Sequence, residues 1–293
     1  MAEVTAALVK ELREITGLGM MECKKALVES NGVLKAAEDL LRVKSGAKAN
    51  KASGRIAAEG VIGTCISGDG KLAAMVEINC ETDFVAKNAD FLDFASTLAQ
   101  LVAKHNPSDL AALSAISVEG GLVEAKRQAL VQKIGENLSI RRFHRIQTGA
   151  KLVQYLHGVK IGVLVEFEGE GDVGKDLAMH IAFAKPQFMS RSEVAPETIT
   201  RERDVLVARA QESGKPANIA EKMVEGGLNK FLGDITLLGQ AFIKDDKLTV
   251  EKMLAARHAK LLSYKFFVVG DGIEKKSSDF AAEVAAQAKA AVG

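Results

Sequence analysis

Side chains that commonly carry out chemistry are sparse in this chain and do not fall at metal-binding or catalytic spacings. The five histidines show no His-Glu-x-x-His or His-x-His pattern, and none lies near a cysteine in the sequence. The three cysteines, Cys23, Cys65 and Cys80, are odd in number and lack a Cys-x-x-Cys pair, which argues against a zinc site and a disulfide framework. The spacing therefore predicts no metal site and three reduced, structural cysteines.

One glycine-rich segment has the spacing of a dinucleotide-binding loop: Gly169-Glu-Gly171-Asp-Val-Gly174. Its two acidic side chains, Glu170 and Asp172, would place carboxylates where a pyrophosphate must bind. The strands before it are expected to pair as a hairpin and not in a parallel βαβ unit. We interpret the segment as a turn. The sequence also contains no Gly-x-x-x-x-Gly-Lys-Ser/Thr phosphate loop.

The most informative stretch leads up to Asn88 and contains one large apolar side chain, Phe84, among polar capping residues. Apolar residues repeat at helical spacing over residues 91–102, and a helix unbroken from Phe84 would put Asn88 in the middle of that apolar stripe. Asn88 is therefore predicted to be the N-cap of a new helix, with Thr82–Lys87 as a separate turn. Periodicity leaves open whether Phe84 packs in the core or projects toward a partner.

Two other features carry open alternatives. His157 is expected at the tip of a hairpin, where it is either a solvated turn residue or a contact. Met20 and Met21 follow Gly19 and suit either the core of a helical module or an adaptable contact surface, with the core expected for at least one of them.

The elements that must position these residues begin with helices. Residues 1 to about 45 are predicted to form three short helices, of which the first is capped by Thr5. The small, polar and basic segment Lys44–Arg55 has no apolar face, which is typical of a linker. The N-terminal part is therefore predicted to be a minimal helical module tethered to the rest of the chain.

Strand patterns follow and occur twice. Gly60–Ile66 and Lys71–Ile78 predict a hairpin, and the helix from Asn88 is expected to cover one of its faces. Lys151–Leu156 and Ile161–Phe167 predict a second hairpin, followed by a helix from about residue 175 to 184. At an offset of 89 residues, Met75-Val-Glu-Ile78 aligns with Leu164-Val-Glu-Phe167 and Phe94 aligns with Phe183. This pattern indicates an internal duplication.

The segments around the second copy complete the predicted framework. A helix is expected from about Val118 to Ile134, and the alternating segment Gly135–Ile146 could be a strand edge for either sheet. After a helix over Ile199–Ala210, the capping-box pattern Asn218-Ile-Ala-Glu221 predicts another helix start. A further helix at Thr249–Leu262 and a strand at Ser263–Val269 would make this helical excursion return to the second sheet. Ser278-Asp279 is expected to cap a closing helix.

Composition limits the classes of function. The chain has 293 residues and is 47% hydrophobic, enough for two or three domains with real cores. Its formal net charge of +1 disfavours a duplex nucleic-acid binder that relies on charge, and 5% aromatic content leaves few platforms for stacking bases. The charged N-terminal stretch resembles neither a signal peptide nor a membrane anchor, which predicts a cytoplasmic protein.

The motifs together resemble one family nearly end to end: elongation factor Ts, the guanine-nucleotide exchange factor of bacterial translation. The motifs that carry the resemblance are Leu8–Leu27, Thr82–Asn88, Gly135-Glu-Asn137 with Ile140-Arg-Arg142, His157-Gly158, Ile219–Gly226 and Gly272-Ile-Glu274. Three positions depart from the commoner family pattern: Glu81, where glutamine is usual, Gly227, where a basic residue is common, and Ala241, where proline is common.

The resemblance implies a function without bond chemistry. The partner would be elongation factor Tu, bound to GDP, and this chain would displace Mg²⁺ from the partner's site and promote GDP release, with no catalytic residue and no cofactor of its own. Phe84 would be a wedge inserted between helices of the partner's GTPase domain, with Asp83 beside it as a polar contact. The partner-binding residues implied are Thr82, Asp83, Phe84 and Val85, with further contacts at Met20, Met21, Ile134, Gly135 and His157.

The resemblance also implies an α+β fold with tandem duplicated core subdomains that contain small antiparallel sheets. The domains expected are a three-helix, UBA-like N-terminal module with its basic linker (1–55), a core N-subdomain (56–148), a core C-subdomain (149–214 and 263–276), a protruding helical hairpin or coiled coil (215–262) and a C-terminal helix module (277–293). The hairpin matches a family element that can serve as a homodimer contact, in a Tu2Ts2-type assembly. No membrane or direct nucleic-acid contact is expected.

Two rivals remain at this level. A ribosome- or RNA-associated protein would use the basic segments Lys44–Arg55 and Arg141–Arg145, and its binding would fall steeply with salt. A thiol or nucleotide-dependent enzyme would need Cys23, Cys65 or Cys80 to converge in space with a histidine and an acid, or would bind a cofactor.

Overall fold

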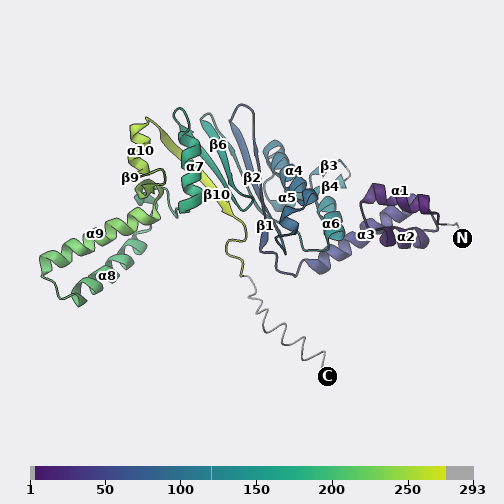
Figure 1. Cartoon of the computed structure of the whole chain (residues 1–293), viewed down its shortest axis with the longest axis horizontal. Helices are drawn as coiled ribbons and strands as arrows, with labels where there is room; N and C mark the ends of the chain where they lie inside the picture. The colour runs from purple at the N-terminus through teal and green to yellow at the C-terminus, as the bar shows by residue number, and fades with distance from the viewer. Residues whose placement is uncertain (1–3, 120, 275–293) are drawn as a thin grey trace, which may run out of the picture. The chain divides into compact units, whose positions relative to one another are not determined.

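The computed structural model describes residues 4–119 and 121–274, whose helices and strands are drawn in Figure 1. These residues divide into two compact units. Within those residues, the first unit contains 4–65, 74–145 and 267–274, and the second contains 66–73 and 146–266. Helices and small sheets occur in both units, so the α+β fold class is confirmed. The predicted closing helix at Ser278-Asp279 and the module at 277–293 lie outside the described residues.

The first unit begins with three helices, α1 (Ala6–Thr16), α2 (Met20–Glu29) and α3 (Leu34–Ala52). The Thr5 hydroxyl accepts a hydrogen bond from Leu8 N at 3.3 Å, which confirms the predicted N-cap. Gly17 ends α1 with φ +67°, a left-handed conformation that glycine adopts without strain. The side chains buried between the three helices are Val9, Leu12, Leu18, Cys23, Ala26, Leu27, Ala37 and Leu41.

The linker prediction for Lys44–Arg55 is wrong, because α3 continues to Ala52. Its second half buries Ser45, Ala49 and Ala52 and packs against α6 (Val123–Ile134). Small side chains allow that close approach without a stripe of large apolar residues, which is why hydrophobic periodicity failed to indicate a helix.

The first sheet has the strand order β1 (Glu59–Ile66), β2 (Leu72–Cys80) and β5 (Ser139–Gln147). The alternating segment that could have joined either sheet is therefore the third strand of this one. Helix α4 (Ala89–His105) follows β2 and lies against β1. A Cβ atom at Gly63 would be 2.3 Å from the carbonyl oxygen of Ala95, so only glycine permits this approach.

Short elements connect α4 to α6 in the first unit. They are α5 (Leu110–Ser114), β3 (Ser117–Val118) and β4 (Gly121–Leu122), and the two strands pair antiparallel. Helix α6 consequently starts at Val123, five residues later than predicted, because the preceding residues form this small hairpin.

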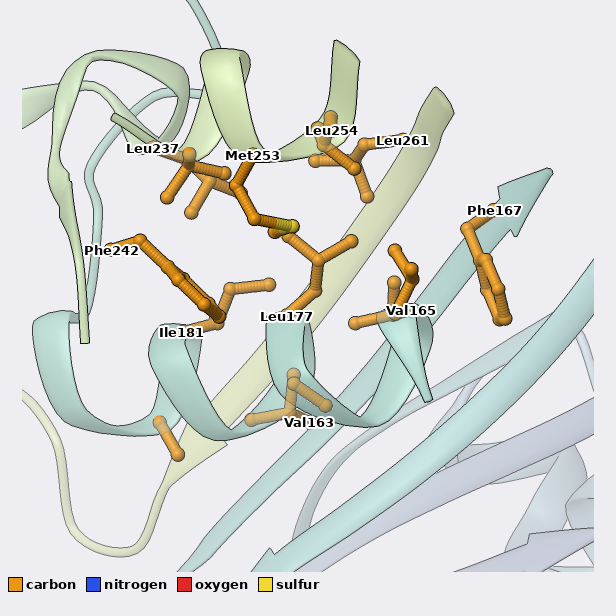
Figure 2. Close-up of a cluster of buried hydrophobic side chains, with 14 residues drawn as sticks. Val163, Val165, Phe167, Leu177, Ile181, Leu237, Phe242, Met253, Leu254 and Leu261 are labelled. Atoms are coloured by element: carbon orange, nitrogen blue, oxygen red, sulfur yellow. The ribbon is translucent and has the colours of Figure 1, made fainter. Parts of the chain in front are cut away.

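The second sheet has the order β10 (Lys260–Val268), β7 (Ile161–Glu168) and β6 (Lys151–His157), with β6 and β7 antiparallel. Helix α7 (Val173–Ala184) packs on it. Residues of η3 (Leu237–Gly239), β8 (Ala241–Phe242) and α10 (Val250–Ala256) belong to the same core as α7 and the sheet, and β9 (Asp245–Thr249) pairs antiparallel with β8. Figure 2 shows Leu177 and Ile181 of α7 facing Phe242 and Met253 in this core.

Two polar side chains of α7 tie these segments together. Asp176 accepts hydrogen bonds from Lys244 at 2.5 Å and Arg257 at 2.9 Å. Burial favours the neutral acid, but these bonds outweigh it and hold the pKa of Asp176 below its ordinary value. The buried His180 accepts from Ile243 N at 3.2 Å through Nδ1, so its Nε2 donates to Gln240 Oε1 at 3.0 Å.

The helical hairpin is also displaced from its expected position. It consists of α8 (Pro196–Glu212) and α9 (Ala217–Ile235), which run side by side (Figure 1) and follow the short η2 (Arg191–Glu193). The predicted partner at 249–262 is instead the seven-residue α10, followed by β10. The capping-box prediction is wrong as well, because α9 already begins at Ala217, directly after Pro216. Proline suits a position that needs no backbone N–H.

Candidate functional site

The segment between β2 and α4 forms a turn that exposes Phe84. The single-turn helix η1 (Val85–Lys87) is separate from α4, and Asn88 Oδ1 accepts a hydrogen bond from Phe91 N at 3.3 Å. Both predictions from the apolar pattern are therefore confirmed. Val85 and Ala86 are buried, whereas Phe84 is 80% exposed. Of the two interpretations of Phe84 that periodicity left open, packing in the core is wrong.

A single carboxylate holds the start of this turn. Glu136 Oε2 accepts hydrogen bonds from the backbone N–H groups of Glu81 and Thr82, both at 3.0 Å, and Glu136 Oε1 accepts from Thr82 Oγ1 at 2.6 Å. The Thr82 hydroxyl in turn accepts from Val85 N at 3.4 Å. Asp83 is half-buried next to Phe84 in the chain and pairs with Lys87 at 2.9 Å. The backbone on both sides of Phe84 is thus fixed, although its ring is not packed.

The turn and the end of α6 exchange hydrogen bonds in both directions. Glu81 Oε1 accepts from Asn137 N and pairs with Arg55 Nε at 3.2 Å, and Arg55 Nη2 donates to the Gly135 carbonyl at 3.1 Å. Glu81, which stands where glutamine is usual in the family, therefore places a negative charge next to the guanidinium of Arg55. The half-buried Ile134 and the exposed Gly135, with φ +89°, end α6 next to Glu136. The structure thus brings Gly135 and the Thr82–Val85 turn into one hydrogen-bonded cluster.

The methionines at the start of α2 are both on the surface. Met20 is 60% exposed and Met21 is 63% exposed, while Cys23, Ala26 and Leu27 of the same helix are buried. The expectation that at least one of them packs in the core is wrong. Two adjacent exposed methionines form an apolar, adaptable surface, the alternative that the sequence left open.

His157 lies in the second unit at the end of β6, exposed and opposite Ile161 in the hairpin. Its Nδ1 is 3.3 Å from Tyr155 Oη. Both side chains line a shallow pocket of about 370 Å³ together with Ile161, Met179, Ala182, Phe183, Lys185 and Ile243. The rim residue Phe183 is 74% exposed. Sequence analysis used Phe183 only as a position of the internal duplication and did not single it out as a surface residue.

The glycine-rich segment Gly169–Gly174 forms the turn between β7 and α7, and its last glycine packs against Phe167. The strands β6 and β7 are antiparallel, so no parallel βαβ unit precedes it. A Cβ atom at Gly174 would lie 2.3 Å from Cε1 of Phe167, so glycine is required there by the ring beneath α7. Lys151 Nζ bonds the Gly169 carbonyl at 2.8 Å and pairs with Glu170 at 2.8 Å. The interpretation as a turn is confirmed.

The basic segments that an RNA-binding protein would use are engaged within the first unit. The carboxylate of Glu77, which is 0% exposed, accepts from Arg141 Nη1 at 3.0 Å and Arg142 Nε at 2.5 Å, as well as from Gly270 N. In the other segment, Lys44 pairs with Glu29 and Lys48 pairs with Glu22. These cations already have partners within the fold, which weakens the case for phosphate contacts.

Neither thiol nor metal chemistry gains support from the arrangement of side chains. Cys23 and Cys80 are buried, Cys65 is half-buried, and all three are free thiols. Within residues 4–119 and 121–274, no three histidine, cysteine or acidic side chains gather closely enough to hold a metal ion. Over the same part of the chain, no helix combines the length and the apolar character needed to cross a bilayer.

Comparison with known proteins identifies the family. The family model described as Elongation factor TS matches residues 81–271. Elongation factor Ts from Bordetella avium (strain 197N) is 60% identical over 288 residues, which cover 98% of this chain and 99% of that protein. The protein of the same name from Nitrosomonas eutropha (strain DSM 101675 / C91 / Nm57) is 56% identical over 289 residues, 98% of each chain. This chain belongs to the elongation factor Ts family.

Proposed function

We propose that this chain is a guanine-nucleotide exchange factor of translation elongation, which binds elongation factor Tu in its GDP form, displaces Mg²⁺ and promotes GDP release. The observation that carries the proposal is the exposed Phe84 on a braced turn, within a segment that resembles the family's Mg²⁺-displacing segment. The names of its relatives support a role in elongation.

Burial of the exposed Phe84 ring against a partner would favour binding. Burying a phenylalanine side chain is worth about 1.5–3 kcal/mol relative to leaving it in water, and a desolvated aromatic anchor contributes about 2 kcal/mol or more to an interface. The turn that carries Phe84 is ordered before binding, so little conformational entropy is lost when the ring inserts. Phe84 therefore suits the role of a wedge, and Asp83 that of a neighbouring polar contact.

Insertion of a wedge near the Mg²⁺ site would weaken nucleotide binding. Mg²⁺ requires near-ideal octahedral geometry, so a shift of about an ångström in the loops that hold it weakens nucleotide binding. The exchange factor must bind the nucleotide-free partner more tightly than either nucleotide form, and the coupling is reciprocal. No bond is made or broken by this chain, so it acts without being an enzyme in the usual sense and without a cofactor.

The other proposed contacts are exposed or half-buried residues in both units. Met20 and Met21 at the start of α2 would grip the partner's GTPase domain, and Ile134 and Gly135 at the end of α6 would contact the partner as well. His157, beside its shallow pocket, would form a separate contact from the second unit. A cytoplasmic location, where translation takes place, belongs to the same proposal.

A homodimer through the helical hairpin is a further part of the proposal. Val205 and Val207 of α8 and Ile219 and Met223 of α9 are exposed apolar side chains, and a pocket of about 670 Å³ lies between the two helices. Burial of this surface against a second copy would give the Tu2Ts2-type assembly. Light scattering of the chain with and without the partner tests it: a mass of one chain across the micromolar range excludes the dimer.

The deciding experiment is stopped-flow release of a fluorescent GDP analogue from elongation factor Tu. We expect this chain to accelerate release and Phe84→Ala to slow that accelerated release about thirtyfold, the equivalent of an anchor of about 2 kcal/mol. Leu122→Ala is the matched control, because Leu122 is also an exposed apolar residue of the first unit and has no assigned contact. Release at the same rate with and without the chain would refute the proposed function.

A further inference from the structure

The hydrogen bonds around Phe84 converge on one side chain, Glu136, which is outside the set of proposed partner contacts. Its carboxylate receives two backbone N–H groups and one hydroxyl from the turn. Bonds to an ionised acceptor are stronger than those between neutral groups. The turn is also closed by bonds of its own, between neutral groups: Ala86 N to Thr82 O at 3.3 Å, Lys87 N to Phe84 O at 3.1 Å and Asn88 N to Val85 O at 2.9 Å, and Cys80 Sγ donates to the Thr82 carbonyl at 3.2 Å.

The backbone on either side of Glu136 is itself well held. Gly135 N donates to the Val131 carbonyl at 2.8 Å and ends α6. Asn137 is buried, and its side-chain nitrogen donates to the carbonyl of Arg55 at 2.7 Å. Helix α6 packs against α3. The carboxylate of Glu136 thus extends from a well-packed segment toward the turn.

The Thr82 hydroxyl transmits this support to the residue after Phe84. Because Thr82 Oγ1 gives its only proton to Glu136 Oε1, its lone pairs are left to accept from Val85 N. Glu136 is therefore hydrogen-bonded to the chain before Phe84, directly at residues 81 and 82, and is linked to residue 85 through the Thr82 hydroxyl. The ring itself is 80% exposed, so packing within this chain does little to orient it.

We infer that Glu136 is the positioning residue of the exchange reaction, which holds the Thr82–Val85 turn in the conformation that aims Phe84 at the partner's nucleotide site. The inference rests on the proposed function. Glu136 acts through Phe84: it reduces the entropy lost when the ring inserts, and it is not itself the wedge.

A measurement without the partner tests the structural half. In the full chain, Glu136→Gln replaces one acceptor oxygen with an NH₂ group and removes the charge. We expect amide hydrogen exchange at Glu81, Thr82 and Val85 to become about tenfold faster, with amides of α4 and α6 unchanged. Glu170→Gln is the matched control, since Glu170 is an exposed carboxylate paired with a lysine in the second unit. Unchanged amides in the turn, or faster exchange throughout α4 and α6, would overturn the inference.

A double-mutant cycle tests the functional half. With Phe84 present, Glu136→Gln should lower the kcat/KM for release of fluorescent GDP about tenfold, and in the Phe84→Ala background by less than about twofold. Effects that simply multiply would mean that Glu136 acts independently of the ring. Glu136→Asp keeps the charge but is too short to reach all three donors, so it should behave like Glu136→Gln. Normal activity of Glu136→Asp would also contradict the positioning role.

The two halves separate failure of this inference from failure of the proposed function. If the unmodified chain does not accelerate GDP release, the proposed function is wrong, and the amide measurement still decides whether Glu136 orders the turn. If the unmodified chain is active but the cycle shows no coupling between Glu136 and Phe84, the function stands and the positioning role is wrong.

Discussion

The two units contain the same arrangement of a three-stranded sheet and a helix, and they differ most in the connection between the central strand and that helix. In the first unit, eight residues (81–88) link β2 to α4, whereas four residues (169–172) link β7 to α7. The longer connection contains the turn with the exposed Phe84. At the offset of 89 residues its counterpart is Val173, which is buried. The exposed Phe84 thus lies in the longer of the two connections.

The difference in length also explains where the predicted duplication fails. The strand alignment holds, because Met75-Val-Glu-Ile78 and Leu164-Val-Glu-Phe167 both lie in the central strand of their sheets. Beyond this connection, the helices of the two copies no longer align at the offset of 89 residues. Phe94 is buried in α4, whereas Phe183 is exposed on α7. A change of a few residues rotates a helical side chain to another face.

The largest expected effect concerns this pair of phenylalanines. Phe94→Ala should lower the free energy of unfolding of the first unit by about 3–4 kcal/mol, because it leaves a cavity in a packed core. Phe183→Ala should change the stability of the second unit by no more than about 0.5 kcal/mol. Urea unfolding of the full chain followed by circular dichroism measures both. Equal losses of stability would contradict the difference in burial between Phe94 and Phe183.

The second largest difference is expected between the glutamates of the two central strands, in how much stability each contributes. Glu77→Gln leaves two arginines without a buried anion, and we expect the first unit to lose about 3 kcal/mol of stability. Its counterpart Glu166 is half-buried and accepts a hydrogen bond from Ser263 Oγ at 2.7 Å. Glu166→Gln should therefore cost about 1 kcal/mol. The same urea series is the measurement, and a larger loss for Glu166→Gln would contradict the comparison.

Phe84→Ala should separate function from stability. Because the ring is exposed, we expect a change in melting temperature of less than about 2 °C alongside the slower GDP release described above. The melting curve and the stopped-flow trace should be recorded on the same preparation. A drop of several degrees with unchanged release would show that Phe84 stabilises the fold and that the wedge role is wrong.

The smallest effect is a pH dependence confined to the second unit. Burial lowers the pKa of His180 below the ordinary value of 6.5, although the hydrogen bond with Gln240 opposes this. Its counterpart at the 89-residue offset, Phe91, does not titrate. As pH falls below about 6.5, the unfolded chain takes up a proton that folded His180 resists, so stability present above that pH is progressively lost. Melting curves from pH 7.5 to 5 measure this loss, which His180→Asn should reduce. An unchanged pH profile in that variant would assign the loss to other groups.

Local patterns were sufficient where a single side chain decides the conformation. Thr5 and Asn88 cap their helices as predicted, since each needs only its own side chain and an N–H three residues later. The errors occurred where packing replaces local preference. Residues 44–52 of the predicted linker are helical and pack against α6 through small side chains, which leave no stripe of large apolar residues to indicate a helix. The hairpin is formed by α8 and α9 and does not include residues 249–262, because α10 and β10 belong to the core that contains α7.

The sequence by itself determined the family, the α+β class and the separate turn at Thr82–Lys87, because motifs, strand alternation and caps are all encoded within a few neighbouring residues. Only the tertiary structure decided that Phe84 points to solvent and that Glu136, more than fifty residues away in the chain, holds its turn. The direction of a side chain depends on which groups from distant segments surround it, and no local pattern contains that information.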